Sequence, residues 1–418
     1  PQLLEKYPEI WKKYLPILEK NLKICFQSKD NPPLNELALL SKLPSLFNDA
    51  IFELLDGFMS HPNPKVRQLI PSALLRHATF FGRSKFQIIC DSLIHNALNE
   101  SVEEVRLKIV EAFNGYEEYL TTRRNLQILA TLANDDSLKV KSSVLDLFAK
   151  LKELTPFNVY TIIRRLLLDA LYILKTPRSY SLRKEMSFLL VKLIRAADNV
   201  LPIYSSIILE ICLNQFQTNT QHDFTVFESK IFHAITINLA NCIEEISKVK
   251  PILLYDKTQQ LIDSFINILS GASPNKTKLA VAHALNAVLE NVKGITIDRS
   301  LLFQKLMNIV SKWASTKLNT EYLKLIGQCG AVCADITQPI SVKNVDLAQP
   351  IETIYFKVVC SVLLNVLKDK SAVAYHQMTI EVLVFIFSQE NFDLEEILDE
   401  FIPLCISNIK ETRAQENL

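Results

Sequence analysis

Glycine is the feature of this sequence that most restricts its fold: only 7 of the 418 residues are glycine, against about 7% in an average protein. Glycine supplies the positive-φ positions of tight hairpins and the loops that closely approach phosphate groups. A chain of this length with so few glycines is poorly suited to a β-rich fold or to a nucleotide-binding enzyme fold. It suits helices, so we predict an all-α protein.

The chain has enough apolar residues to fold, and its charges are balanced. Hydrophobic residues make up 49% of it, so it can bury enough apolar surface to offset its conformational entropy, which excludes intrinsic disorder. The 46 basic residues nearly equal the 45 acidic ones, whereas a general binder of phosphate backbones needs a basic excess. At about 150 residues per domain, the length fits roughly three domains or one elongated array.

Apolar residues recur with the period of a helix in almost every segment, and the helical segments pair across short polar breaks. Several second helices begin with a polar stretch, an apolar residue and then a basic one, as in residues 61–67 (His-Pro-Asn-Pro-Lys-Val-Arg). The apolar anchors of four such starts are Val66, Val105, Val140 and Leu182, which are 39, 35 and 42 residues apart. A helical-hairpin repeat of about 40–47 residues is typical of HEAT and armadillo arrays.

The pattern therefore predicts an α-solenoid (superhelix) of HEAT-like helical hairpins, with about nine repeats. Residues 1–334 should form one array, 335–350 a linker between hairpins, and 351–418 further hairpins, because prolines lie near both ends of the linker. Asn, Asp or Ser side chains should cap each second helix, and the apolar anchor should enter the core. The likeness to HEAT arrays, and not the spacing itself, implies that the basic residue reaches carboxylates or carbonyl groups of a neighbouring repeat.

No residue can be nominated as catalytic, cofactor-binding or metal-binding. Gly327 and Gly330 are the closest glycine pair, but no strand-to-helix pattern follows them, which favours close helix packing over a phosphate loop. The nucleophile elbow of hydrolases and the catalytic-loop and Asp-Phe-Gly signatures of kinases are absent from the sequence. We therefore predict that this chain is not an enzyme and holds no cofactor of its own.

The titratable residues fit structural roles. No two histidines have the His-x-x-x-His spacing of a zinc site, and adjacent acidic pairs on a helix usually form a solvated face. The histidines are His61, His77, His95, His222, His233, His283 and His376, and the acidic pairs are Glu103–Glu104, Glu117–Glu118, Glu244–Glu245 and Glu395–Glu396. Arg123–Arg124 and Arg164–Arg165 could contribute to a basic groove, but aromatic residues do not cluster among the basic ones, so nucleic-acid binding is disfavoured.

The eight cysteines indicate a reducing compartment. They are scattered, and nearly all lie in apolar stretches where a thiol behaves as a small hydrophobe; Cys329 and Cys333 share a helix face without a second ligand pair. The sequence has no signal-peptide pattern and no apolar run of membrane-spanning length. We expect a soluble, cytoplasmic protein, and the start at Pro1 suggests a fragment or a trimmed chain.

Several segments, in order and at compatible spacing, resemble the N-terminal helical solenoid of the target-of-rapamycin (TOR) kinases of the phosphatidylinositol-3-kinase-related family. The segments are 132–151 (Leu-Ala-Asn-Asp-Asp to Ala-Lys-Leu), 155–159, 163–165, 183–185, 201–204, 326–332 (Ile-Gly-Gln-Cys-Gly-Ala-Val), 367–371, 375–378 and 385–387. Ala149 stands where the family has Gly, and Cys333-Ala334 where it has Asp-Pro. The chain is therefore either a divergent TOR or a relative that shares its solenoid.

The resemblance implies a large Ser/Thr protein kinase that controls growth in response to nutrients, of which this chain lacks the FAT, rapamycin-binding and kinase regions. ATP and Mg²⁺ would belong to the absent kinase domain. This segment would be a non-catalytic scaffold that dimerises the complex and docks Raptor- or Rictor-type accessory subunits, in the cytoplasm or peripherally on endomembranes. The alternative is another HEAT-repeat scaffold, such as a nuclear transport receptor or a phosphatase regulatory subunit.

Overall fold

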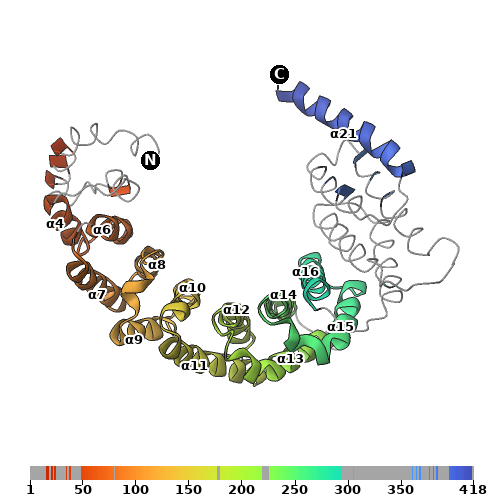
Figure 1. Ribbon diagram of the computed structural model, residues 1–418, viewed down its shortest axis with the longest axis horizontal. Helices are drawn as coiled ribbons and strands as arrows, with labels where there is room; N and C mark the ends of the chain where they lie inside the picture. Colours follow the sequence, from red (N-terminus) through yellow and green to blue (C-terminus); the bar gives the residue numbers. More distant parts are fainter. Residues whose placement is uncertain are drawn as a thin grey trace. The chain divides into compact units, whose positions relative to one another are not determined.

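The computed structural model describes residues 49–79, 81–176, 179–218, 226–292 and 395–416, together with isolated positions elsewhere. Every regular element in these ranges is a helix (Figure 1). The glycine-poor composition thus gives the fold class that it predicted. The proposed linker at 335–350 and most of the chain from 293 to 394 lie outside the described residues. The count of about nine repeats and the predicted boundaries therefore stay predictions.

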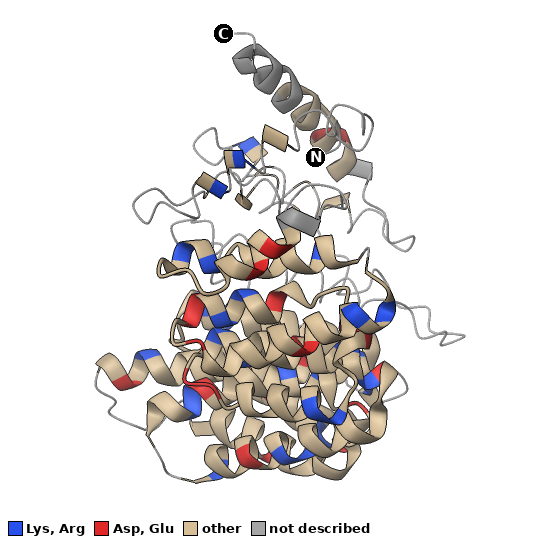
Figure 2. Cartoon of the chain, turned by 90° about the vertical axis from the view of Figure 1, so that its left-hand side faces the viewer, with Lys and Arg blue, Asp and Glu red and all other residues tan. Residues whose placement is uncertain are grey.

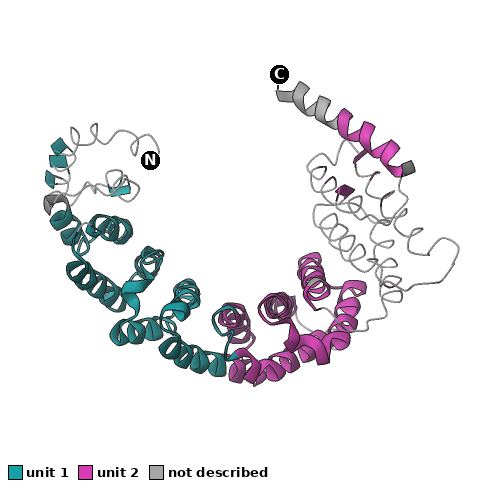
Figure 3. Cartoon of the chain, in the orientation of Figure 1, with its two compact units in different colours: residues 1–169, 195–200 teal, residues 170–194, 201–418 magenta. Residues whose placement is uncertain are grey.

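The chain divides into two compact units, coloured separately in Figure 3. Unit 1 comprises Pro1–Asp169 and Arg195–Val200, and unit 2 comprises Ala170–Ile194 and Leu201–Leu418. The chain therefore passes from one unit to the other three times: within α11 (Pro156–Lys175), within α12 (Tyr180–Ala196) and between Val200 and Leu201.

Unit 1 is a stack of helical hairpins. Its elements are α4 (Asp49–Phe58), α5 (Pro64–Arg67), α6 (Ile70–Ala78), α7 (Arg83–Asn99), α8 (Glu103–Ala112), the 3₁₀ turn η1 (Glu117–Leu120), α9 (Arg123–Leu132), α10 (Leu138–Leu154) and the first part of α11 (Pro156–Lys175). Helices α7 and α9 pack together in one layer, and α8 packs between α6 and α10 in the other (Figure 1). The pairs α7–α8 and α9–α10 are the hairpins that the repeat predicted.

Unit 2, described by itself, also consists of packed helices. Its elements are the last turns of α11, most of α12 (Tyr180–Ala196), then α13 (Leu201–Gln217), α14 (Val226–Val249), the 3₁₀ segment η3 (Pro251–Lys257), α15 (Thr258–Ser270), α16 (Asn275–Asn291) and α21 (Glu395–Glu416). Helix α13 packs on α15, and α14 packs on α16. The buried small residues Ala282, Ala284 and Ala287 let α16 lie close to its neighbours, as the alanine-rich sequence indicates.

Three of the four predicted anchors are fully buried. Val66, Val105 and Val140 each stand third in their helix, with no exposed surface. Leu182 occupies the same position in α12 but is only half-buried.

Side-chain oxygens cap α5 and α10, as predicted, but the prediction is wrong for α8 and α16, whose N-cap residues Val102 and Pro274 make no side-chain hydrogen bond. Asn63 Oδ1 accepts a hydrogen bond from the Lys65 N–H at the start of α5. Ser137 Oγ accepts one from the Val140 N–H at the start of α10, at 3.4 Å. Each bond satisfies a backbone donor that has no partner within its own helix.

One glycine needs its special backbone freedom. Gly115, in the turn after α8, has a φ of +95°, which side chains with a Cβ rarely adopt. Among the glycines that the structure describes, it alone has a positive φ.

Candidate interaction site

The basic residue after the anchor joins neighbouring repeats in unit 1. Arg67 donates from Nε and Nη2 to the two carboxylate oxygens of Glu100, at 2.8 and 2.9 Å. Its Nη1 donates to the carbonyl oxygens of His61 and Pro62. One guanidinium therefore ties the start of its own helix to the turn before α8, which confirms the role predicted for this residue.

Arg106 repeats the arrangement one hairpin later. It donates from Nε and Nη2 to Asp135 at 2.7 and 2.8 Å, and from Nη1 to the carbonyl oxygens of Glu100 and Ser101. Glu100 therefore receives Arg67 at its side chain and Arg106 at its backbone. We call these linked contacts the arginine ladder (Arg67, Glu100, Arg106 and Asp135).

The ladder carboxylates are ionised more easily than usual. Burial alone raises the pKa of Asp135, but hydrogen bonds from Arg106 and from the Ser137 N–H outweigh it and hold the pKa below its ordinary value. The pKa of Glu100 is likewise raised by burial and lowered on balance by Arg67 and the Val102 N–H. Charge-assisted, bidentate pairs of this kind are the strongest hydrogen bonds that side chains make.

A third polar cluster in unit 1 joins the end of α10 to the turn after α12. Asp198 accepts hydrogen bonds from Lys152 Nζ at 3.1 Å and from the Tyr160 hydroxyl at 2.9 Å, and Asn199 donates to the same hydroxyl. Burial, then the hydrogen bond to Asp198, raises the pKa of Tyr160 to about 12. Burial raises the pKa of Asp198, but the hydrogen bond from Lys152 outweighs it together with that from Tyr160, so this pKa lies below its ordinary value. These hydrogen bonds hold α10 and α11 against the turn after α12.

Unit 1 should therefore become less stable at acidic pH. The pKa of Glu100, Asp135 and Asp198 is lower in the folded chain than in the unfolded one, so protons bind the unfolded chain first and stability falls as the pH drops below about 5. Circular dichroism melts between pH 3 and 7 at constant ionic strength should show the midpoint falling across the lower half of this range. Asp135→Asn removes one of these carboxyl groups, so its midpoint should depend less on pH. Parallel curves for the two proteins would contradict the assignment.

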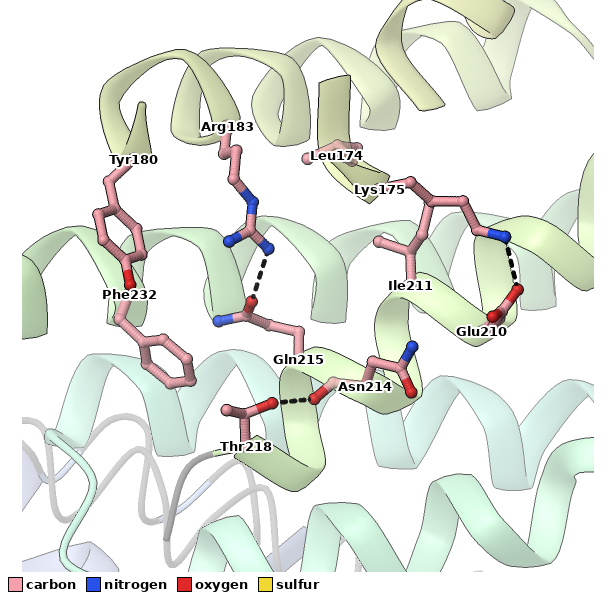
Figure 4. A pocket seen from close by; sticks show the side chains of 10 residues that line it. All are labelled: Leu174, Lys175, Tyr180, Arg183, Glu210, Ile211, Asn214, Gln215, Thr218 and Phe232. Atoms are coloured by element: carbon pink, nitrogen blue, oxygen red, sulfur yellow. Dashed lines mark hydrogen bonds and ion pairs between the residues drawn. The ribbon is translucent and has the colours of Figure 1, made fainter. Parts of the chain in front are cut away.

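In unit 2 the structure has a cavity of about 340 Å³ where α11, α12, α13 and α14 meet (Figure 4). Its described lining consists of Leu174, Lys175, Tyr180, Arg183, Glu210, Ile211, Asn214, Gln215, Thr218 and Phe232. Lys175 pairs with Glu210 at 2.9 Å. Arg183 Nη2 lies 3.5 Å from Gln215 Oε1, at the outer limit of a hydrogen bond. Sequence reasoning had not singled out this site.

Most of the cysteines that the structure describes are buried thiols. Cys90, Cys212, Cys242 and Cys360 are buried and Cys405 is half-buried. Burial raises the pKa of Cys90 and of Cys360 to about 12, and a thiol so far from ionisation reacts slowly. Cys329 and Cys333, noted from the sequence, lie outside the described residues.

Alkylation should reveal this protection. With iodoacetamide at pH 8, Cys90, Cys212 and Cys242 should be modified much more slowly in the folded protein than in guanidinium, because each is buried and its pKa is raised. Peptide mass spectrometry gives the rate at each site, and the half-buried Cys405 serves as the internal comparison. Equal rates for Cys90 and Cys405 would contradict the packing of α7.

The other residues considered from the sequence are mostly structural. His61 Nδ1 accepts a hydrogen bond from the Asn63 N–H, and Glu117 pairs with Lys150. The prediction of a solvated face is wrong for Glu245, which is buried because α14 is covered by α13, α16 and η3. Cys25, His222 and the pair Gly327 and Gly330 lie outside the described residues.

Charges of both signs are mixed on the described helices (Figure 2). Arg123, Arg124, Arg164 and Arg165 are all exposed, but Figure 2 shows acidic residues among the basic ones. In the described part of the chain, no group of three or more His, Cys, Asp or Glu side chains could hold a metal ion. None of the helices described there is both long and apolar enough to cross a membrane.

Comparison with known proteins supports the family resemblance. The family model described as "Serine/threonine-protein kinase mTOR domain" matches residues 295–418. The serine/threonine-protein kinase TOR2 of Saccharomyces cerevisiae is 21% identical over an alignment that covers 83% of this chain and 15% of TOR2. The chain thus spans a small part of that relative's length. Together these matches confirm the resemblance to the N-terminal, non-kinase region of TOR kinases.

Solved structures confirm the fold. A crystal structure of importin beta in an ammonium sulfate condition superposes with a TM-score of 0.59 at 13% identity, covering 92% of this chain and 46% of that one. Kap121p bound to Pho4p gives a TM-score of 0.51 at 13% identity, with 97% and 44% covered. At this identity the likeness concerns the helical solenoid alone.

Proposed function

We propose that this chain, which resembles the N-terminal, non-kinase region of the TOR kinases, is a non-catalytic scaffold segment of such a kinase. The observation that carries the proposal is the combination of that resemblance with a stack of hairpins that depend on one another. Each hairpin buries its faces only against its neighbours, as in other repeat proteins. Such a stack offers long surfaces for other proteins rather than an enclosed reaction site.

The proposed partners are a second copy of the kinase and Raptor- or Rictor-type accessory subunits, in a cytoplasmic, nutrient-responsive growth-control complex. Exposed apolar side chains support protein contacts. In unit 2, Ile203 and Ile252 each follow a proline at the start of a helix, and they are 63% and 68% exposed. Catalysis, ATP and Mg²⁺ belong, in this proposal, to a kinase domain elsewhere in the parent protein.

Affinity purification of the endogenous full-length protein, followed by cross-linking mass spectrometry, tests the scaffold role. We expect a second copy of the kinase and a Raptor- or Rictor-type subunit to cross-link to residues of this segment. Recovery of a transport GTPase or a phosphatase catalytic subunit without such a subunit would favour the other HEAT scaffolds. ATP hydrolysis by the purified 418-residue chain would contradict the non-catalytic assignment.

A further inference from the structure

Arg183 stands where the ladder arginines stand, but it lacks their carboxylate. Arg67, Arg106 and Arg183 are each the fourth residue of their helix. Arg67 and Arg106 each make a bidentate contact with an acid and two bonds to carbonyl oxygens. Arg183 makes one contact, the 3.5 Å approach to the neutral Gln215, and its buried Nε has no hydrogen-bond partner.

The surrounding residues do not neutralise this guanidinium. Among the described lining residues, the charged ones are Lys175, Glu210 and Arg183, and the first two pair with each other. Gln215 is held in place because its Nε2 donates to Thr236 Oγ1, so that its oxygen faces Arg183. In the view of Figure 4, Tyr180 and Phe232 lie to one side of Arg183 and the Lys175–Glu210 pair to the other.

The cavity suits a carboxylate at the end of a short apolar stem. A guanidinium presents its N–H groups in a planar fork that matches a carboxylate, and a partly buried one that lacks such a partner forgoes strong hydrogen bonds. Leu174, Ile211 and Phe232 supply apolar walls for the methylene groups of a glutamate side chain, and apolar surroundings strengthen the charge interaction. The volume of about 340 Å³ exceeds what a single carboxylate needs and lies at the small end of ligand pockets.

We propose that this cavity, the Arg183 pocket, receives a glutamate side chain from an acidic segment of a partner protein. The partner's carboxylate forms the bidentate contact with Arg183 that Glu100 and Asp135 form within the ladder. The Arg183 pocket would be one docking point of the scaffold, so its biological role rests on the proposed function. The competing occupant is Asp223, which lies outside the described residues and precedes α14 by three residues, as Glu100 and Asp135 precede α8 and α10.

A peptide-binding measurement on the complete 418-residue chain tests the pocket without any TOR subunit. Fluorescein-labelled hexaglutamate should bind in an anisotropy titration, and hexaglutamine should not. Arg183→Gln should weaken binding at least about tenfold, because it removes the bidentate charge partner. The matched control is Arg165→Gln, which removes an exposed arginine outside the pocket and should change affinity by less than about twofold.

A second variant keeps the test decisive if Arg183→Gln folds poorly. Gln215→Glu places a carboxylate of nearly the same shape beside Arg183, so it should abolish hexaglutamate binding while raising the thermal midpoint. Equal affinities for the Arg183→Gln and Arg165→Gln variants would overturn the proposal.

Two further outcomes would also overturn it. Displacement of the peptide by inorganic phosphate at far lower concentration than by glutarate would assign the pocket to phosphate groups. Tighter hexaglutamate binding in Asp223→Asn would show that the chain fills its own pocket. Because no TOR subunit takes part, these results are independent of the cross-linking test of the scaffold role.

Discussion

Val105→Asp should destabilise the first unit by about 4 kcal/mol or more, which is beyond the range of ordinary point substitutions. Val105 has no exposed surface and stands in α8, which packs against α6, α7 and α10. A carboxylate there would either lose its water without gaining a partner or force neighbouring hairpins apart. Thermal and urea melts of the full chain, followed by circular dichroism, should show an early transition absent from the wild type.

Ile88→Asp is the matched control for this experiment. It makes the same kind of change, apolar to acidic, on the adjacent helix α7, where Ile88 is 67% exposed. Its effect should stay within about 0.5 kcal/mol, as for most surface substitutions. If the two variants melted alike, or if Val105→Asp melted with the wild type, the repeat register deduced from the anchors would be wrong.

The parts of the fold that follow from local chemistry could be predicted from the sequence. The positions of Val66, Val105 and Val140 follow from helical periodicity and from the polar stretches before them, both of which depend on neighbouring residues. The kind of contact that Arg67 makes with Glu100 was expected from the likeness to HEAT arrays, in which the basic residue after the anchor reaches a neighbouring repeat. Its particular partner depends on how the two hairpins stack.

Features that depend on the stacking of several helices could not be predicted. An adjacent acidic pair indicates a solvated face, yet Glu245 is buried because α14 is covered by three other elements. Arg183 follows the same local pattern as Arg67 and Arg106, and only the packing of α11, α12, α13 and α14 reveals a cavity beside it. The sequence pattern thus located Arg67, Arg106 and Arg183, but not the different surroundings of Arg183.

Loss of the Arg106–Asp135 pair should lower the free energy of unfolding substantially. We expect Asp135→Asn to lower the stability of unit 1 by about 2–4 kcal/mol. The side chains of Arg106 and Asp135 are only 15% and 8% exposed, so solvent cannot replace the lost charge. The amide group of asparagine would also present N–H donors to the donors of Arg106. Urea denaturation of the full chain, monitored by circular dichroism, gives the change in the free energy of unfolding.

A double-mutant cycle separates the pair from its surroundings. Arg106→Gln alone should cost a similar amount, and the double variant should cost less than the sum of the two, by about 1–3 kcal/mol. The comparison pair is Lys108 and Glu111, whose side chains are 49% and 40% exposed, and whose coupling should stay below about 1 kcal/mol. Equal coupling energies in the two pairs would mean that the Arg106–Asp135 pair stabilises the fold no more than an ordinary surface ion pair does. It would also remove the reason to expect that Arg183, which has no carboxylate partner among the described residues, binds an acid.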